Sequence, residues 1–328
     1  MLPMIMRMKF NAKQTGLTLI ELLVALAIGS FLIIGAVQIY NQSRQAFVIN
    51  ESMARVQETA QFAMDMIEAD LRMASSWGQT SRALAIEGRS ILGDTNPLGL
   101  PEPDKCGDGW ALNLAVTVDG SNNDYTLPCA AQPAAQADSD LVTIRRATVD
   151  PMPLEAGRMQ IQTTRVQGAV FANGVVPAPF SPADSATHNL LVNTYYVADD
   201  SPLIPGAPTL RRKTLTVTSG APGINDIEIA PGVESLQVQF GIDVNEDNTV
   251  DRYVNPGDDV YIPTAAGYVP GAKVITARVW LVVRGLNPEV GIVDNRDYKP
   301  GDVDLGVIND GYRRMQVSKT ILLRNART

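Results

Sequence analysis

The hydrophobic residues of this chain begin with an almost unbroken run. From Leu17 to Val37 nearly every position is apolar, and the only charge in the run is the carboxylate of Glu21. A continuous apolar stretch of about 20 residues is long enough to cross a bilayer as a helix. The pattern therefore predicts a membrane-spanning first element over residues 17–37.

The helical pattern continues beyond this run. Residues 38–77 contain neither proline nor glycine, and apolar residues recur there at three- and four-residue spacing. The members of this stripe are Val56, Ala60, Ala63, Ile67, Leu71 and Ala74. Gly78 follows as a stop signal. We expect one helix over residues 17–77, with its second half packed on a globular head.

After Gly78 the pattern changes from helical to strand-like. Residues 79–137 are rich in Gly, Pro, Asn and Asp, which predicts a long, mostly irregular excursion. Segments of strand character follow, separated by turn residues. They are residues 141–148, 159–163, 190–197, 210–217, 233–242, 274–283 and 315–323. The expected fold class is α+β, with a long N-terminal helix on a large antiparallel β-rich head over residues 78–328.

The charge distribution indicates on which side of a membrane the N-terminus would lie. The chain has 328 residues and a net charge of −8, which argues against nucleic acid as a partner because phosphate binding needs a basic face. Residues 1–16 carry Arg7, Lys9 and Lys13 and no acid. A short basic start before an apolar run is a targeting signal. It predicts a cytoplasmic N-terminus with the rest of the chain outside.

Two cysteines, Cys106 and Cys129, lie in the part predicted to be exported. In an oxidising compartment such a pair favours one disulfide. The alternative is two unpaired thiols.

The position of Glu21 needs its own explanation. A carboxylate inside the apolar zone costs about 2–3 kcal/mol or more unless it is paired. A plain signal-anchor or a cleaved secretory signal accounts for the apolar run and leaves Glu21 unexplained. Cleavage between Gly16 and Leu17 would create an α-amino group four residues before Glu21. A neighbouring subunit could offer that amine as a counter-charge, so that Glu21 sets the register of docking.

The segment Gly16-Leu17-Thr18-Leu19-Ile20-Glu21-Leu22-Leu23 resembles the class III signal of type IV prepilins and type II secretion pseudopilins. The resemblance implies that residues 1–16 are a leader removed by a prepilin peptidase after Gly16. Leu17 would become the first mature residue and be N-methylated, although phenylalanine is commonest at this position in the family. Glu21 matches the glutamate that the family uses in assembly.

Two later strings, residues 139–146 and 322–325, resemble the PilW branch of minor pilins, which is itself similar to the J-type pseudopilins. The resemblance implies a single-pass protein of the bacterial inner membrane with a periplasmic head, which later reaches the pilus tip. Its implied partners are other minor pilins, the major pilin, the prepilin peptidase, the inner-membrane assembly platform and a tip adhesin. Its implied role is to prime pilus assembly and thereby promote adhesion and twitching motility. A J-type pseudopilin of type II secretion is the alternative.

The sequence offers little for an enzyme. His188 is the single histidine, it has no triad context, and we expect it in a loop. There is no phosphate-binding or dinucleotide-binding motif, and the cysteine and histidine spacing does not suit zinc. A membrane-anchored enzyme or solute-binding head would also leave Glu21 unexplained. We expect no enzyme and no required cofactor.

One acidic segment has partial calcium-loop spacing. Asp243, Asn245, Asp247, Thr249 and Asp251 occupy positions one, three, five, seven and nine of such a loop. The glycine at position six is replaced by asparagine, and the bidentate glutamate at position twelve is missing. A calcium-dependent binding module at the pilus tip is therefore a further hypothesis. The alternative is a solvated acidic hairpin loop.

Overall fold

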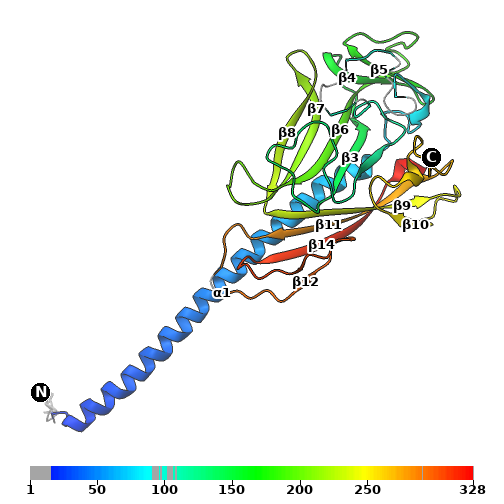
Figure 1. Cartoon of the computed structure of the whole chain (residues 1–328). Helices are drawn as coiled ribbons and strands as arrows, with labels where there is room; N and C mark the ends of the chain where they lie inside the picture. The colour runs from blue at the N-terminus through cyan, green and yellow to red at the C-terminus, as the bar shows by residue number, and fades with distance from the viewer. Residues whose placement is uncertain are drawn as a thin grey trace, which may run out of the picture. The chain divides into compact units, whose positions relative to one another are not determined.

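The protein is described by a computed structural model that covers residues 16–90, 96, 98–101, 106–107, 109–289 and 291–327, shown in Figure 1. The expected leader, apart from its last residue Gly16, lies outside the described residues. The chain divides into two compact units, residues 1–51 and residues 52–328. A single helix, α1 (Leu19–Met73), contributes to both. We call residues 52–328 the head.

The helix ends at Met73, whereas the sequence predicted that it continues to Trp77. Ser75 has a positive φ of 66° and so cannot continue the helix. The backbone then bonds to a strand of the head: Ser75 N–H donates to the carbonyl of Arg145, and Ser76 O accepts from Ala147 N–H at 2.7 Å. These tertiary bonds replace the last predicted turn, which leaves Trp77 buried in the head.

The larger sheet has eight strands in the order β1-β5-β4-β6-β3-β2, with β7 pairing with β6 and β8 pairing with β7. Its strands are β1 (Ile86–Glu87), β2 (Val118–Ser121), β3 (Leu141–Ala147), β4 (Ala156–Thr163), β5 (Gly168–Asn173), β6 (Ala186–Ala198), β7 (Thr209–Thr218) and β8 (Ala221–Pro231). All neighbours are antiparallel except β1 and β5. The long β6 is the centre of this sheet, since β3, β4 and β7 all pair with it.

A second, four-stranded antiparallel sheet has the order β10-β9-β11-β14. Its strands are β9 (Val233–Asp243), β10 (Arg252–Val254), β11 (Lys273–Arg284) and β14 (Arg314–Leu322). A small pair, β12 (Asp297–Tyr298) and β13 (Gly306–Val307), lies in the connection between β11 and β14. Short 3-10 helices cover Ala83–Ala85, Asp259–Tyr261 and Arg324–Arg327. The predicted helix-plus-antiparallel-sheet class is confirmed.

The main core lies between the amphipathic half of α1 and both sheets. Val56, Ala60, Ala63, Ile67, Leu71 and Ala74 of the predicted stripe are all buried in it. Their partners include Val142 of β3, Tyr195 of β6, Phe240 of β9 and Val279 of β11. A helix with one apolar face gains most of its stability from such packing. The stripe therefore places both sheets against one helix.

A second core forms under the excursion of residues 79–137. It contains Trp77, Trp110, Leu112, both cysteines and apolar residues of β4 and β6, such as Ile161 and Val192. The buried side chain of Arg145 organises this region, because its Nε donates to Trp110 O at 2.8 Å and its Nη1 to Val116 O at 2.6 Å. The excursion is thus irregular in backbone and still well packed.

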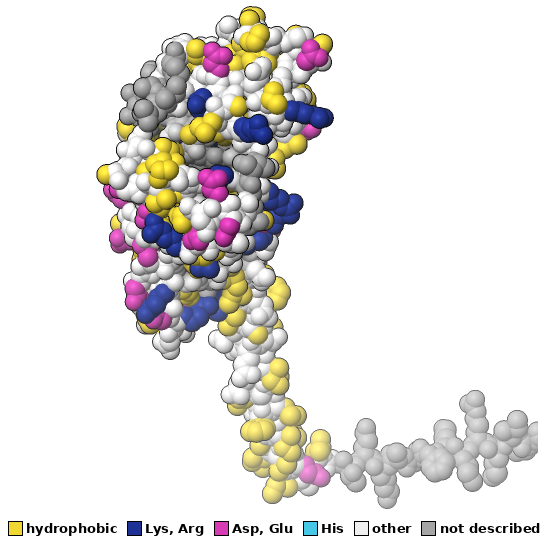
Figure 2. Space-filling model, turned by 90° about the vertical axis from the view of Figure 1, so that its right-hand side faces the viewer, with side chains coloured by type: hydrophobic (Ala, Val, Ile, Leu, Met, Phe, Trp, Pro, Cys, Tyr) yellow, Lys and Arg dark blue, Asp and Glu magenta, His cyan; other side chains and the backbone are white. Residues whose placement is uncertain are grey.

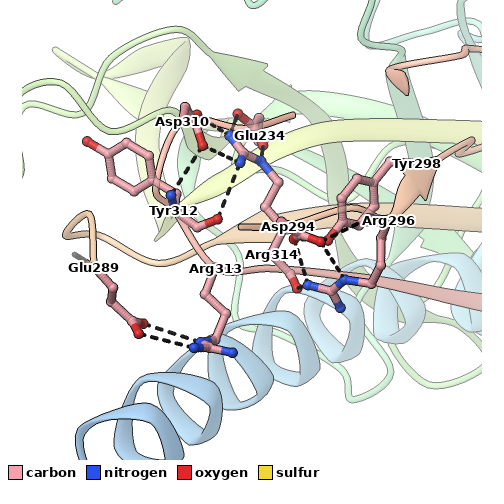
Figure 3. A network of polar contacts seen from close by, with 9 residues as sticks. All are labelled: Glu234, Glu289, Asp294, Arg296, Tyr298, Asp310, Tyr312, Arg313 and Arg314. Atoms are coloured by element: carbon pink, nitrogen blue, oxygen red, sulfur yellow. Dashed lines mark hydrogen bonds and ion pairs between the residues drawn. The ribbon is translucent and has the colours of Figure 1, made fainter. Parts of the chain in front are cut away.

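Ion pairs anchor the long connection between β11 and β14, as Figure 3 shows. The fully buried Arg314 pairs with Glu234 of β9 and with Asp310, each at 2.6 Å. The hydrogen bonds from Arg314 stabilise the charged form of Asp310 and lower its pKa to about 2. Earlier in the same connection, Arg296 pairs with Asp294 at 2.8 Å and holds the pKa of that carboxyl well below its usual range.

Candidate functional site

The N-terminal segment contains the residues that the sequence assigns to processing and assembly. Gly16 and Leu17 precede the helix, have no regular secondary structure and are exposed. A side chain built at Gly16 would meet no other atom within 4 Å. The peptide bond between these residues is therefore accessible in the described chain. Cleavage there and methylation of Leu17 stay predictions.

Glu21 has a partner within its own chain that the sequence reasoning missed. Its Oε2 accepts hydrogen bonds from Thr18 N–H at 2.9 Å and from Thr18 Oγ1 at 2.8 Å. In return, Glu21 N–H donates to Thr18 Oγ1 at 3.3 Å. This reciprocal arrangement is a capping box, which satisfies N–H groups that a helix start leaves unpaired. A threonine three residues before a glutamate at the head of an apolar run is the signal that could have revealed it.

Among the described residues of its own unit, the apolar side chains of the helix beyond Glu21 are exposed. Leu23, Phe31 and Ile34 are examples of the exposed large apolar residues in this stretch, and Figure 2 shows hydrophobic side chains along its visible face. The most apolar 18-residue window has a mean hydropathy of 2.5, and none of it is buried. By length and composition this helix could cross a membrane.

Gly29 and Gly35 lie in the apolar stretch of α1, and no close contact in the described chain requires a glycine at either position. A side chain added at either position would meet no atom within 4 Å. Glycine inside a helix is destabilising by about 0.5–1 kcal/mol relative to alanine. Small residues on an apolar helix let another helix approach closely. The structure thus leaves helix packing, or softening of the helix, as the reason for these glycines.

The disulfide is confirmed: Cys106 and Cys129 are bonded to each other. Both cysteines are buried in the second core. Tyr125 holds the end of the loop, because its hydroxyl donates to Cys129 O at 2.5 Å and its ring packs edge-on against Tyr196 of β6 at 5.1 Å. The crosslink therefore fastens the excursion to the larger sheet.

The acidic segment 243–251 folds as a self-bonded turn after β9. Both oxygens of Asp243 accept backbone N–H groups, from Asn245 at 3.2 Å and from Asn248 at 2.7 Å. Asp247 accepts from Thr249 N–H at 2.8 Å, and its pKa is lowered by the Thr249 bonds.

Asp251 closes the turn, since it accepts from Val244 N–H at 2.8 Å. Thr249 donates its hydroxyl to Asp247. Among the described residues, no group of three or more His, Cys, Asp or Glu side chains is arranged to hold a metal ion. The carboxylates of this loop therefore bind its own backbone, and calcium at residues 243–251 is not shown.

The expectation that His188 lies in a loop is wrong. His188 belongs to β6, where it pairs with Ile161 of β4, and it is 2% exposed. Its Nδ1 lies 2.8 Å from Thr148 O, and its ring packs so closely on Gly78 that a side chain at Gly78 would lie 2.4 Å from it. The pairing with β4 extends β6 toward the N-terminus beyond its apolar run. His188 is a packed core residue.

A cavity of about 690 Å³ lies in the head, beside the end of α1 and the C-terminal residues. Its polar lining includes Arg82, Lys273, Glu246 and Tyr268, and neither histidine nor cysteine belongs to its lining. The volume is in the range of ligand pockets. Its described lining does not pair a nucleophile with a histidine base.

Comparisons with known protein families match two segments of the chain. Residues 11–37 match the model of the prokaryotic N-terminal methylation motif, and residues 194–325 match that of PilW, type IV pilus-assembly protein W. A comparison with curated protein sequences gave no match. Among solved structures, a type IV-like pilin from Thermus thermophilus is similar at 13% identity and a TM-score of 0.36, over 84% of this chain and 99% of that one. The chain therefore carries a prokaryotic N-terminal methylation motif near its start and a PilW domain over residues 194–325.

Proposed function

We propose that this chain is a minor pilin that primes or supports type IV pilus assembly from the inner membrane. The observation that carries the proposal is the exposed apolar helix that begins at the Thr18–Glu21 capping box, directly after the expected cleavage bond. In water such a surface is unstable, but it is satisfied in a bilayer and then among the helices of other pilins. The surface thus suits transfer from membrane to filament.

Glu21 guides the docking of the helix during this transfer from membrane to filament. Cleavage after Gly16 frees an amine at Leu17, and in a stack of helices the amine of one subunit meets the Glu21 carboxylate of its neighbour. The Thr18 bonds satisfy Glu21 until that neighbour arrives, since a hydrogen-bonded carboxylate is less costly in an apolar setting than a bare one. Gly29 and Gly35 leave room for close helix contact.

The head supports a position at the start of the filament. Heterologous packing of identical helices continues into an open filament once it has begun. A head made of residues 52–328, with two sheets and a long excursion, is difficult to repeat along a filament wall and is accommodated at its end. The partners are then other minor pilins, the major pilin, the prepilin peptidase and the assembly platform, and the head reaches the cell surface, where it promotes adhesion and twitching. No enzymatic activity is part of this role.

The test is the amount of pilin that can be sheared from the surface of a deletion strain. Complementation with the wild-type gene should restore it, and Glu21→Ala should not. Glu58→Ala, on an exposed position of the same helix, is the matched control and should behave as wild type. Normal surface pili in the deletion strain would overturn the priming role. If exoproteins then stay trapped in the periplasm, the chain is a type II secretion pseudopilin.

A further inference from the structure

Four separate stretches of the chain form most of the wall of the cavity of about 690 Å³ in the head. Residues 81–85 follow α1, and residues 115–118 lead into β2. The third stretch lies within residues 261–274, up to the start of β11, and the fourth lies within residues 323–326, after β14. All four belong to the same compact unit. Segments that are far apart in the sequence therefore surround one space that no described side chain fills.

Most of the side chains that line this cavity are apolar or aromatic. Val116, Leu323 and Tyr261 are buried, and Tyr268 is half-buried. Leu84, also in the lining, is 71% exposed. Displacing water from an apolar wall by apolar ligand surface is favourable. The cavity therefore suits a ligand with an apolar body.

The charged side chains of the lining favour an anion. Arg82 and Lys273 are two cations, and Glu246 is the one acid among the described lining residues. In the part of the chain that the structure describes, neither the Arg82 nor the Lys273 side chain forms an ion pair or a hydrogen bond. The described lining thus carries a net positive charge, in a chain whose net charge is −8.

A backbone amide at the edge of β2 adds a hydrogen-bond donor. Arg145 N–H donates to Thr117 O at 2.9 Å, so the backbone of Thr117 bonds toward β3. Because successive residues of an antiparallel strand alternate between bonding to the neighbour and facing away from it, the N–H of Val118 points away from β3. β2 is the last strand of its sheet, and Val118 lines the cavity. This N–H therefore lies at the edge that borders the cavity, where it can donate to an anion.

We propose that this cavity binds a small carboxylate with an apolar body. Arg82 and Lys273 attract the carboxylate, because hydrogen bonds between cationic donors and an ionised acceptor are short and strong. The wall around Leu84 and Val116 covers the apolar part of the ligand. The volume lies within the range of ligand pockets.

The lining argues against two other classes of ligand. Inorganic phosphate would leave the apolar wall uncovered, and an organic cation would be repelled by Arg82 and Lys273. A carboxylate with an apolar body satisfies both the charge and the wall. This inference does not depend on the role in pilus assembly.

The test is a calorimetric titration of the full chain in detergent micelles, with micelles alone as the blank. The probes are 4-phenylbutyrate, its uncharged amide 4-phenylbutyramide and the amine 4-phenylbutylamine, which share one apolar body and differ in charge. A carboxylate with about 12 non-hydrogen atoms and an ordinary ligand efficiency binds with a Kd of about 1 mM. We expect a Kd roughly fivefold higher or more for the amide, and the highest Kd for the amine.

Variants of the lining separate the effect of the charges from that of the apolar wall. Arg82→Gln and Lys273→Gln should each raise the Kd of 4-phenylbutyrate roughly threefold or more and leave that of the amide unchanged. Arg324→Gln changes an exposed cation of the adjoining segment that does not line the cavity, so it should bind as wild type. Ala115→Phe places a ring in the cavity from an exposed position and should abolish binding of all three probes.

A gain-of-binding variant guards against a misfolded one. Glu246 is exposed in the turn after β9, so Glu246→Gln should fold as wild type. Because it removes the one acid of the described lining, it should lower the Kd of 4-phenylbutyrate about two- to threefold. No binding at about 10 mM, or equal affinities for the carboxylate and the amide, would overturn the proposal. An equal loss in Arg324→Gln and Arg82→Gln would also overturn it, because the attraction would then come from the surface charge in general.

Discussion

The hydroxyl of Tyr195 donates a hydrogen bond to Oδ2 of Asp70 at 2.7 Å, across the contact between β6 and α1. The same oxygen accepts from Asn193 Nδ2 at 2.7 Å, and Oδ1 pairs with Arg146 of β3, also at 2.7 Å. Asp70 is 3% exposed. One buried carboxylate on the helix therefore gathers donors from the two central strands of the larger sheet.

Removing the charge of Asp70 should loosen the packing of the larger sheet on α1. Asp70→Asn leaves Arg146 without a counter-charge, and breaking a buried pair from one side typically costs about 3–5 kcal/mol. The measurement is urea unfolding of the full chain in micelles, followed by near-UV circular dichroism. Asp65→Asn, an exposed acid one turn earlier, should stay within about 0.5 kcal/mol of wild type. Equal losses in both variants would show that Asp70 has no special role.

A substitution at Thr18 distinguishes the two roles proposed for Glu21, which are capping the helix and supplying a charge for assembly. Thr18→Ala removes the capping box and should cost the helix start about 1 kcal/mol, but it keeps the Glu21 charge. Glu21→Gln keeps a side chain that can accept a bond and removes the charge. We expect Thr18→Ala to restore most sheared surface pilin in the deletion strain and Glu21→Gln to restore little. The reverse result would assign Glu21 to capping alone.

The disulfide should make a measurable contribution to stability. It closes a loop with a sequence separation of 23 residues, for which chain entropy predicts about 3 kcal/mol. Replacing both Cys106 and Cys129 by serine should lower the urea midpoint accordingly. Dithiothreitol should lower it for the wild type and leave the double variant unchanged. An unaffected wild type under reducing conditions would mean that packing alone holds the excursion.

Asp140 should make the head less stable as the pH rises. Its pKa is about 7 in the folded chain, against about 4 unfolded. Between these values the folded state holds one proton more, so its contribution is fully present below pH 4 and lost through pH 7, at up to about 1.4 kcal/mol per pH unit.

The measurement is the slope of unfolding free energy against pH from 4 to 7, taken in EDTA. Asp140→Asn should flatten that slope even if it lowers stability overall, because it removes the titrating group. A slope that persists unchanged in the variant would assign the pH dependence to other groups.

Local patterns predicted most of the regular structure. The apolar run and the three-and-four spacing predicted the helix, and the strand-like segments predicted β3, β4, β6, β7, β9, β11 and β14. They missed β8 (Ala221–Pro231), whose prolines and glycine near its ends signal a turn, and β5, which is short. Helix periodicity and strand alternation reflect which face is buried, so they are visible without tertiary knowledge.

Polar residues were less predictable, because their partners are distant in sequence. The spacing of residues 243–251 suggested a calcium loop, but backbone N–H groups take up the carboxylates instead. His188 looked like a loop residue until its pairing with Ile161 of β4 placed it in a strand. Composition and spacing do not show which donors will surround an acid or a ring.

The sequence by itself determined the N-terminal segment: Gly16, Leu17 and Glu21 are recognisable because their spacing, charge and hydrophobic context lie within a few adjacent residues. The two sheets and the contacts of Asp70 with β3 and β6 were decided only by the tertiary structure. Asn122 and Asp302, for example, are separated by 180 residues and meet at 3.0 Å. Such contacts depend on strand order and register, which arise from packing of the whole chain and leave no local pattern.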